Sequence, residues 1–160
     1  MYSLSKKVDS VRQAAVTLGL NNLKNWINLL ALGSLENKPQ VLIETAMIRA
    51  RMCELIGMII TKKETAEAYF TVGLFSIIDA FFDTPLEDLV DKLSLNQDMS
   101  DALIKRKGII GATLKVVVHH QEGHLQPKTL SLLSEYSING ECITRCYLES
   151  LMWAKQENVN

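Results

Sequence analysis

The stretch PQVLIETAMIRARMCELIGMII, residues 39–60, decides the fold class. Its apolar residues recur at helical spacing and do not alternate as they would in a half-buried strand. Pro39 suits the first turn of a helix, because its missing N–H falls where a helix has no internal partner. The sequence therefore predicts one long helix from about residue 39 to about residue 60.

Further helices are predicted on both sides of this segment. Only three prolines and eight glycines interrupt the 160 residues, and the apolar residues between them keep helical spacing. In chain order we expect these other helices over about 8–18, 21–33, 64–82, 84–93, 96–107, 110–118, 127 onward and 139–156. With no linker, low-complexity tract or repeat, residues 1–160 are predicted to form one compact all-α bundle of about nine helices.

Three more of the predicted helices have recognisable start signals. Thr84-Pro85-Leu86-Glu87 combines a capping hydroxyl, a first-turn proline and a glutamate three residues after the cap, which is typical of a capping box. Asn96 or Ser94 would open the next helix, and Asn139 would cap the last one. The three valines at 116–118 leave a strand possible at that point.

Composition indicates a folded chain with no electrostatic bias. Hydrophobic residues make up 48% and charged residues 22%, which excludes disorder as the main state. The formal net charge of -1 gives no overall reason to bind nucleic acid or an anionic membrane. The start Met1-Tyr2-Ser3-Leu4 does not have the pattern of a signal peptide, and no apolar run reaches membrane-spanning length.

The cysteines point to a reducing compartment. Cys53, Cys142 and Cys146 are odd in number and lie within apolar helical stretches, with no disulfide-like spacing. Reduced thiols and a cytoplasmic location are therefore expected. Cys142 and Cys146 share a helical face and could supply two soft metal ligands, but a structural zinc needs four, so buried thiols are the simpler interpretation.

Several motifs together resemble a known family. The segment SVRQAAVTLG at 10–19, followed by LKNW at 23–26, is similar to the core of HDOD domains, the HD-related output domains of bacteria. Arg49-Ala50, Cys53-Glu54 and VGLFSIIDA at 72–80 look like the versions joined to an EAL cyclic di-GMP phosphodiesterase module, and the likeness continues to Trp153-Ala154. The resemblance implies a fold related to the HD phosphohydrolases and a signalling role.

The same resemblance implies a lost hydrolytic site. In an HD hydrolase an adjacent His-Asp pair holds metal that acidifies a water. Ser76-Ile77 stands there in this chain, and neither side chain replaces those ligands well. No cofactor is expected. Family members also have helices before the matched segment, so the chain is expected to lack its first helices, and it contains no EAL module.

A small set of polar residues on the predicted helices forms the candidate site. Asp79 stands on a segment rich in apolar residues, where a carboxylate needs a partner such as an arginine or a helix terminus. Arg49 and Arg51 on the preceding helix are the candidate arginines. The candidates for a structural or binding network are Arg49, Arg51, Glu54, Ser76 and Asp79. A Ser-Asp pair without a histidine or lysine base gives no activated nucleophile.

The histidines form the only cluster suggestive of a metal site. His119, His120 and His124 are all the histidines of the chain, and on a continuous helix His120 and His124 would share a face. Gly123 favours a helix end between them, and Glu122 is the only acidic neighbour. We therefore expect no physiological metal there.

Two further expectations concern residues 8–32. Residues 11–32 resemble a helix-turn-helix, although the remaining chain offers no basic surface for DNA. If covering helices are absent, apolar surface on this pair would be exposed and would favour a homodimer. The leading hypothesis is a non-catalytic signalling or scaffold domain that contacts protein partners. A divergent metal-dependent HD-type phosphohydrolase and a DNA-binding regulator are the alternatives.

Overall fold

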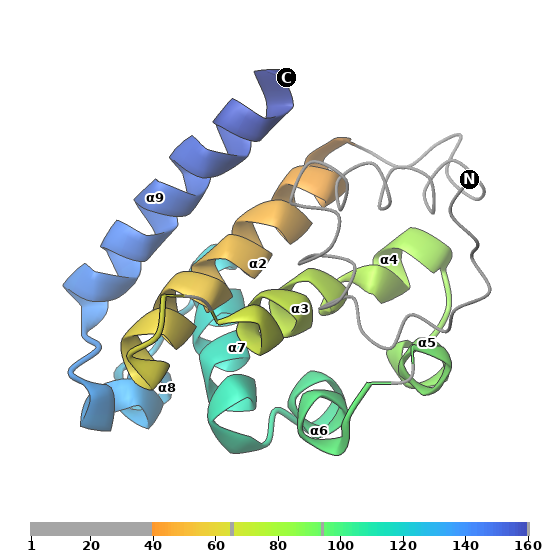
Figure 1. The fold of residues 1–160 in the computed structure, drawn as a ribbon, viewed down its shortest axis with the longest axis horizontal. Coiled ribbons are helices and arrows are strands. Elements are labelled where there is room, and N and C mark those ends of the chain that lie inside the picture. Colours follow the sequence, from red (N-terminus) through yellow and green to blue (C-terminus); the bar gives the residue numbers. More distant parts are fainter. Residues whose placement is uncertain (1–39, 65, 94, 160) are drawn as a thin grey trace.

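A computed structural model of the chain describes residues 40–64, 66–93 and 95–159. These residues form a helical bundle without strands, so the all-α prediction is confirmed (Figure 1). The elements are α2 (Gln40–Thr61), α3 (Glu67–Phe75), α4 (Ile78–Phe82), α5 (Leu86–Lys92), α6 (Gln97–Lys105), α7 (Gly108–Gln121), α8 (Pro127–Leu130), the 3-10 helix η1 (Ser131–Tyr136) and α9 (Gly140–Val159). The helices predicted over 8–18 and 21–33 lie outside the described residues.

The long helix α2 is the centre of the described structure. It agrees with the prediction for 39–60 to within a residue at each end, and it packs against α3, α7 and α9 (Figure 1). Its buried side chains, including Met52, Cys53 and Ile56, join a core that continues through α3, α6, α7 and the start of α9. Elements on either side of α2 are thereby brought within side-chain reach of one another.

Helices α2 and α3 approach closely because a glycine faces the contact. A Cβ atom on Gly73 would lie 2.8 Å from both the Cα of Ala50 and the carbonyl oxygen of Arg49. No real Cβ tolerates such a distance to backbone, so any larger residue would push the helices apart. The close contact holds the end of α3 beside the middle of α2.

The predicted helix over 64–82 is wrong in one respect, because the structure divides it into α3 and α4. The break falls at Ser76 and Ile77, and Ile77 has the non-helical angles φ -123° and ψ 8°. In a continuous helix the Ile77 N–H would bond the Gly73 carbonyl, but the Ser76 hydroxyl donates to that oxygen at 2.7 Å. A serine that bonds nearby backbone in this way competes with helix propagation.

The predicted capping box at Thr84 is also wrong. Asp83 ends α4 in the left-handed conformation with φ 50°, and the Thr84 hydroxyl donates to the carbonyl of Phe82. Pro85 has ψ 140° and is itself the residue before α5, which has no side-chain cap. The hydroxyl is used to close the end of α4 and is therefore not available at the start of α5.

Other start signals are confirmed. The side chain of Asn96 accepts the Met99 N–H, and that of Asn139 accepts the Cys142 N–H, both at 2.9 Å. The valines at 116–118 lie within α7, where Val116 and Val117 are fully buried. Packing in the core thus decides against the strand.

Helix α9 lies at one edge of the described structure, beside α2 and along its length (Figure 1). Its inward side chains include Ile143, Cys146 and Ala154, which are buried, whereas Leu148 and Met152 are more than half exposed. None of the helices in the described part of the chain has both the length and the apolar character needed to cross a membrane.

Candidate functional site

The side chain of Arg49 joins three parts of the fold in a buried network. It extends from the middle of α2 and is only 7% exposed. Its Nε donates to Oε1 of Gln121 at the end of α7 (2.7 Å), and its Nη1 donates to Oγ of Ser76 just after α3 (3.1 Å). The Ser76 hydroxyl in turn donates to the carbonyl of Gly73. We call Arg49, Ser76 and Gln121 the arginine network.

Gln121 is a member of this network that sequence reasoning missed. It is separated from Arg49 by 72 positions, and glutamine at a helix end carries no chemical signature. Only the packing of α2 against α7 brings the two together. Arg49 and Ser76 were both predicted as candidates from the sequence, and the structure places them in direct contact.

Burial sets the electrostatics around the arginine network. Desolvation lowers the pKa of Arg49 and also that of Arg106, whose guanidinium folds back to donate to the carbonyls of Ala102 and Leu103. Cys53, which also interacts with both arginines, has its pKa raised to about 12 by burial. Among the described residues, both hydrogen-bond acceptors of Arg49 are neutral groups. The network is therefore a buried positive charge held by neutral oxygens.

Asp79 does not join the arginine network as a direct partner. Its side chain is exposed, and its Oδ1 accepts the N–H of Ala80 at 2.9 Å. Among the described residues, the suggested arginine is therefore not the direct partner of Asp79. The other suggested partner, a helix terminus, fits, because Asp79 lies in the first turn of α4, which begins after the break at Ser76 and Ile77. Asp79 and Glu122 act on Arg49 at longer range, where their negative charge opposes the lowering of its pKa.

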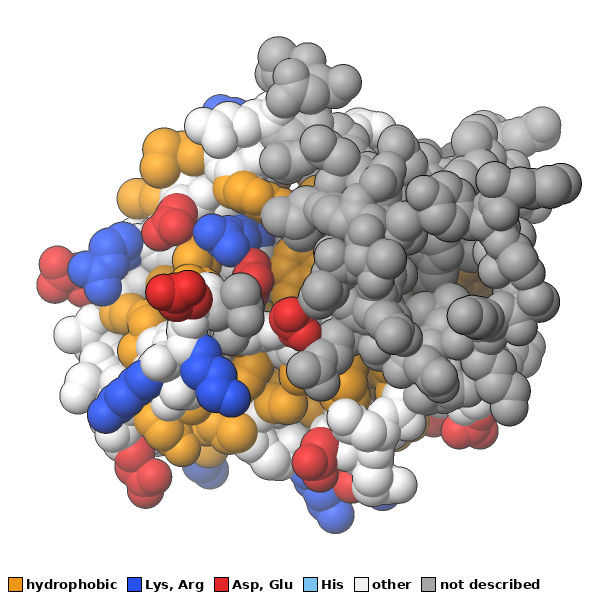
Figure 2. Space-filling view, in the orientation of Figure 1, with side chains coloured by type: hydrophobic (Ala, Val, Ile, Leu, Met, Phe, Trp, Pro, Cys, Tyr) orange, Lys and Arg blue, Asp and Glu red, His pale blue; other side chains and the backbone are white. Residues whose placement is uncertain are grey.

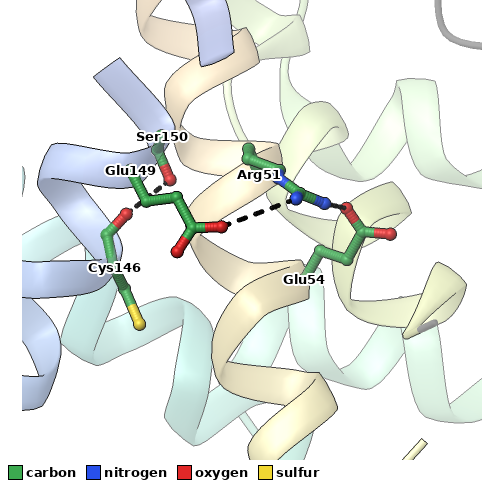
Figure 3. Close-up of polar contacts among 5 residues, drawn as sticks. All are labelled: Arg51, Glu54, Cys146, Glu149 and Ser150. Atoms are coloured by element: carbon green, nitrogen blue, oxygen red, sulfur yellow. Dashed lines mark hydrogen bonds and ion pairs between the residues drawn. The ribbon is translucent and has the colours of Figure 1, made fainter. Parts of the chain in front are cut away.

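Arg51 and Glu54 form a second, separate cluster that connects α2 to α9 (Figure 3). Nη1 of Arg51 lies 2.6 Å from Oε2 of Glu54, and Nη2 lies 3.8 Å from Oε1 of Glu149 on α9. The guanidinium also lies 5.8 Å from the centre of the Trp153 ring, within cation–π range. The five candidate residues thus separate into the arginine network, this interhelical cluster and the exposed Asp79.

The histidines lie at the C-terminal end of α7, where Gly123 ends the helix as expected. Gly123 has φ 74°, its N–H donates to the His120 carbonyl, and the N–H of His124 donates to the His119 carbonyl at 2.9 Å. This pattern is a Schellman motif, and it turns the chain back on itself. The rings of His119 and His124 consequently lie 4.5 Å apart.

His120 has different neighbours from the other two histidines. Its ring packs edge-on against Tyr147 of α9 at 5.0 Å, whereas Nδ1 of His119 lies 3.3 Å from the Thr129 hydroxyl. Burial lowers the pKa of both His119 and His120. Among the described residues, no three His, Cys, Asp or Glu side chains are grouped so that they could hold a metal ion.

The three cysteines are free thiols, and all are buried. Cys142 and Cys146 lie one turn apart on α9, so their side chains are neighbours on one face of the helix. Burial, together with this neighbour, raises the pKa of Cys146 to about 12. Such thiols are poorly ionised at neutral pH and behave as small apolar core residues.

Two curated proteins are similar to nearly the whole chain. "Uncharacterized protein YuxH" of Bacillus subtilis is 30% identical over 154 residues, which are 94% of this chain and 37% of that protein. "Cyclic di-GMP phosphodiesterase CdgJ" of Vibrio cholerae is 30% identical over 156 residues, which are 97% of this chain and 36% of that protein. The chain therefore spans little more than a third of the length of either relative.

The other two comparisons found no match. No family model matches the chain, and no solved structure matches it. The similarity to CdgJ agrees with the cyclic di-GMP association that the sequence motifs imply.

Proposed function

We propose that this chain is a non-catalytic bacterial signalling domain of the HDOD type, which acts through protein contacts in a cyclic di-GMP pathway. CdgJ is named for hydrolysis of cyclic di-GMP, but only 36% of its length matches this chain. In this proposal, the part of CdgJ that does not match this chain carries out the hydrolysis. The part that matches, and by analogy this chain, has the regulatory role.

The arginine network is the observation that carries the proposal. By resemblance, Ser76 and Ile77 stand where an HD hydrolase has its metal-binding His-Asp pair. The Ser76 hydroxyl is engaged by the guanidinium of Arg49 at 3.1 Å, and Arg49 is buried. A metal cation at this point would meet a fixed positive charge.

The size of that repulsion favours a regulatory role over hydrolysis. Two unit charges 4 Å apart interact by about 4 kcal/mol at the dielectric typical of a protein surface, and a divalent ion doubles this. The ligands offered in return are one hydroxyl that is already hydrogen-bonded and one isoleucine, neither of which binds Mn²⁺ or Mg²⁺ well.

A hydrolysis assay tests the absence of catalysis. The purified 160-residue chain is incubated with cyclic di-GMP, and separately with a generic phosphodiester, with and without added Mn²⁺. We expect no turnover above that of buffer with metal. Metal-dependent hydrolysis that is lost in Asp79→Asn or His120→Gln would overturn the proposal and favour a divergent phosphohydrolase.

A deletion in CdgJ tests the regulatory part. The region that matches this chain is removed from CdgJ, and hydrolysis of cyclic di-GMP is compared with that of the intact protein. The proposal expects hydrolysis to persist, with an altered rate or an altered response to binding partners. Complete loss from a deletion protein that remains folded and still binds cyclic di-GMP would place catalytic residues in the matched region and contradict the proposal.

A further inference from the structure

The outward face of α9 carries a regular stripe that the described fold leaves uncovered. The stripe consists of five side chains separated by alternating steps of four and three residues, which we call the α9 stripe: Glu141, Arg145, Leu148, Met152 and Lys155. All five are exposed, and Leu148 and Met152 are 53% and 60% exposed. A shallow hollow runs along part of the same face.

The spacing of the α9 stripe is that of a helix-pairing seam. Steps of four and three residues are the heptad spacing by which one helix packs along another. The opposite face of α9 is already used, because Ile143, Cys146 and Ala154 are buried towards the core. In Figure 2, apolar and charged side chains are interspersed along the left edge, where Figure 1 shows α9.

We infer that the α9 stripe pairs with the same stripe of a second copy of this chain, in antiparallel orientation, around a two-fold axis at Leu148. The inference goes beyond the proposed function and does not depend on it, since a catalytic chain could pair through the same face. It places a homodimer contact on α9, whereas the sequence suggested residues 8–32, which lie outside the described part.

Charge complementarity selects the second copy and its direction. Glu141 and Lys155 each lie seven residues from Leu148, on opposite sides of it. In an antiparallel pair centred on Leu148, Glu141 of each copy therefore faces Lys155 of the other, which gives two ion pairs by symmetry. Within the described part of the chain, neither of these two side chains is in an ion pair that would compete.

The same charges disfavour the parallel arrangement. Parallel pairing would bring Glu141 against Glu141, Arg145 against Arg145 and Lys155 against Lys155 of the second copy. Like charges facing each other along a helix seam are destabilising. Leu148 packs on Leu148 in both arrangements, so the charges decide between them. A face with both charge signs placed symmetrically about a leucine is self-complementary.

The expected affinity is modest. At 1.5 Å per residue the 20-residue helix is about 30 Å long, and a single helix pair buries less than the roughly 800 Å² per partner of a standard interface. We therefore expect the dimer to have a dissociation constant in the micromolar range. The dimer should therefore be seen in a concentration series and missed at high dilution.

The test is sedimentation equilibrium of the full chain at concentrations from about 1 to about 500 µM, and charge-reversal variants provide the critical comparison.

The variant Leu148→Glu places two carboxylates opposite each other at the two-fold axis and should weaken association about tenfold or more. Glu141→Lys alone and Lys155→Glu alone should each weaken it several-fold, and the double variant Glu141→Lys/Lys155→Glu should restore it. Leu132→Glu on η1, where the leucine is 47% exposed, is the matched control and should leave association unchanged.

Each contrary result overturns the inference. A monomeric wild-type chain across the series means that another partner covers the α9 stripe or that nothing does. A dimer that survives Leu148→Glu uses a different surface. If Glu141→Lys and Lys155→Glu each weaken association and the double variant does not restore it, the antiparallel register is excluded. Circular dichroism of each variant checks that the helices are retained.

Discussion

Arg49 shows how a charged side chain can be kept in the interior of a helical fold. Burying an unpaired charge is costly, and the cost falls when hydrogen-bond acceptors replace the lost water. Ser76 and Gln121 provide two such acceptors from different helices. The same side chain therefore determines both the local polarity of the core and the way in which three segments meet.

Ser76→Ala should lower the free energy of unfolding by about 1–3 kcal/mol, because the substitution removes the hydroxyl that accepts the Nη1 hydrogen bond of the buried Arg49 guanidinium. Adding Arg49→Met should recover part of the loss, since an apolar side chain of similar length needs no acceptor. Urea unfolding followed by circular dichroism measures both variants. Thr144→Ala on the exposed face of α9 removes a comparable hydroxyl and should change stability by less than about 0.5 kcal/mol. Equal effects of Ser76→Ala and Thr144→Ala would contradict a supporting role of Ser76.

The cysteines allow a second prediction at the residue scale. Cys53, Cys142 and Cys146 are buried, and burial raises the pKa of Cys53 and of Cys146 to about 12. Only thiolates react readily with disulfide reagents, so labelling by DTNB at pH 8 should be slow in the folded chain and fast in urea. Rapid labelling of all three thiols without denaturant would show that the core around them opens easily.

At the scale of elements, close packing of α2 on α3 is what brings Arg49 to Ser76. Gly73 allows that packing because its missing Cβ leaves room for the backbone of Arg49 and Ala50. Gly111 serves a similar purpose between α6 and α7, where a Cβ would lie 2.3 Å from the carbonyl carbon of Arg106. The arginine network thus depends on Gly73 in two ways, because its missing Cβ permits the close packing and its carbonyl oxygen accepts the Ser76 hydroxyl.

Gly73→Ala should lower stability although alanine is the better helix former. The gain in helix propensity is about 1 kcal/mol, and forcing a methyl group against backbone typically costs 1–3 kcal/mol, so we expect a net loss of up to about 2 kcal/mol. Gly140→Ala at the start of α9 is the control, because its nearest neighbour would be a leucine methyl at 4.0 Å. Thermal unfolding of both variants distinguishes the two environments. If Gly73→Ala and Gly140→Ala unfold at the same temperature, then α2 and α3 can move apart at Gly73 without a loss of stability.

Local signals predicted the elements well, and the exceptions have physical causes. Asn96 and Asn139 cap helices as expected, because a cap needs only the residue itself and the next three. The break after α3 was missed because its cause is a single serine hydroxyl bonding a nearby carbonyl. Gln121 could not be predicted as a site residue because its role arises from a contact across 72 positions.

At the scale of the whole molecule, three segments meet around the histidines at the end of α7. His119 faces Thr129 and His124, with Lys115, Glu122 and Arg106 as the other charged groups that influence it. His120 faces Tyr147. The contacts join α7 to α8 and to α9, so the protonation state of these rings affects how separate elements pack.

Stability should therefore fall as the solution becomes mildly acidic. The pKa values of His119 and His120 are lowered from 6.5 in the folded chain, so the unfolded chain binds more protons below that pH. The contribution of these two histidines to the free energy of unfolding is fully present above about pH 7.5. It declines as the pH falls through 6.5 towards their lower pKa values in the folded chain. Partial exposure of both rings makes the decline modest.

Urea midpoints at pH 8 and pH 5.5 provide the measurement. The double variant His119→Gln/His120→Gln should flatten the difference between the two midpoints. Asp101, whose pKa is lowered chiefly by its hydrogen bond to Lys105, loses its contribution only below 3.8 and does not confound the result. A difference that persists in the double variant would assign it to other groups.

The one-sided attachment of α9 also has a dynamic consequence. Because α9 packs chiefly on α2 and lies at the edge of the bundle, its hydrogen bonds can open without disturbing the contacts among α2, α3 and α7. Amide protons of α9 should then exchange with deuterium sooner than those of α2, and the segment between η1 and α9 should be an early point of proteolytic cleavage. A ligand that covers the free face would slow both processes, so the exchange rate of this one helix can report when the chain has found its partner.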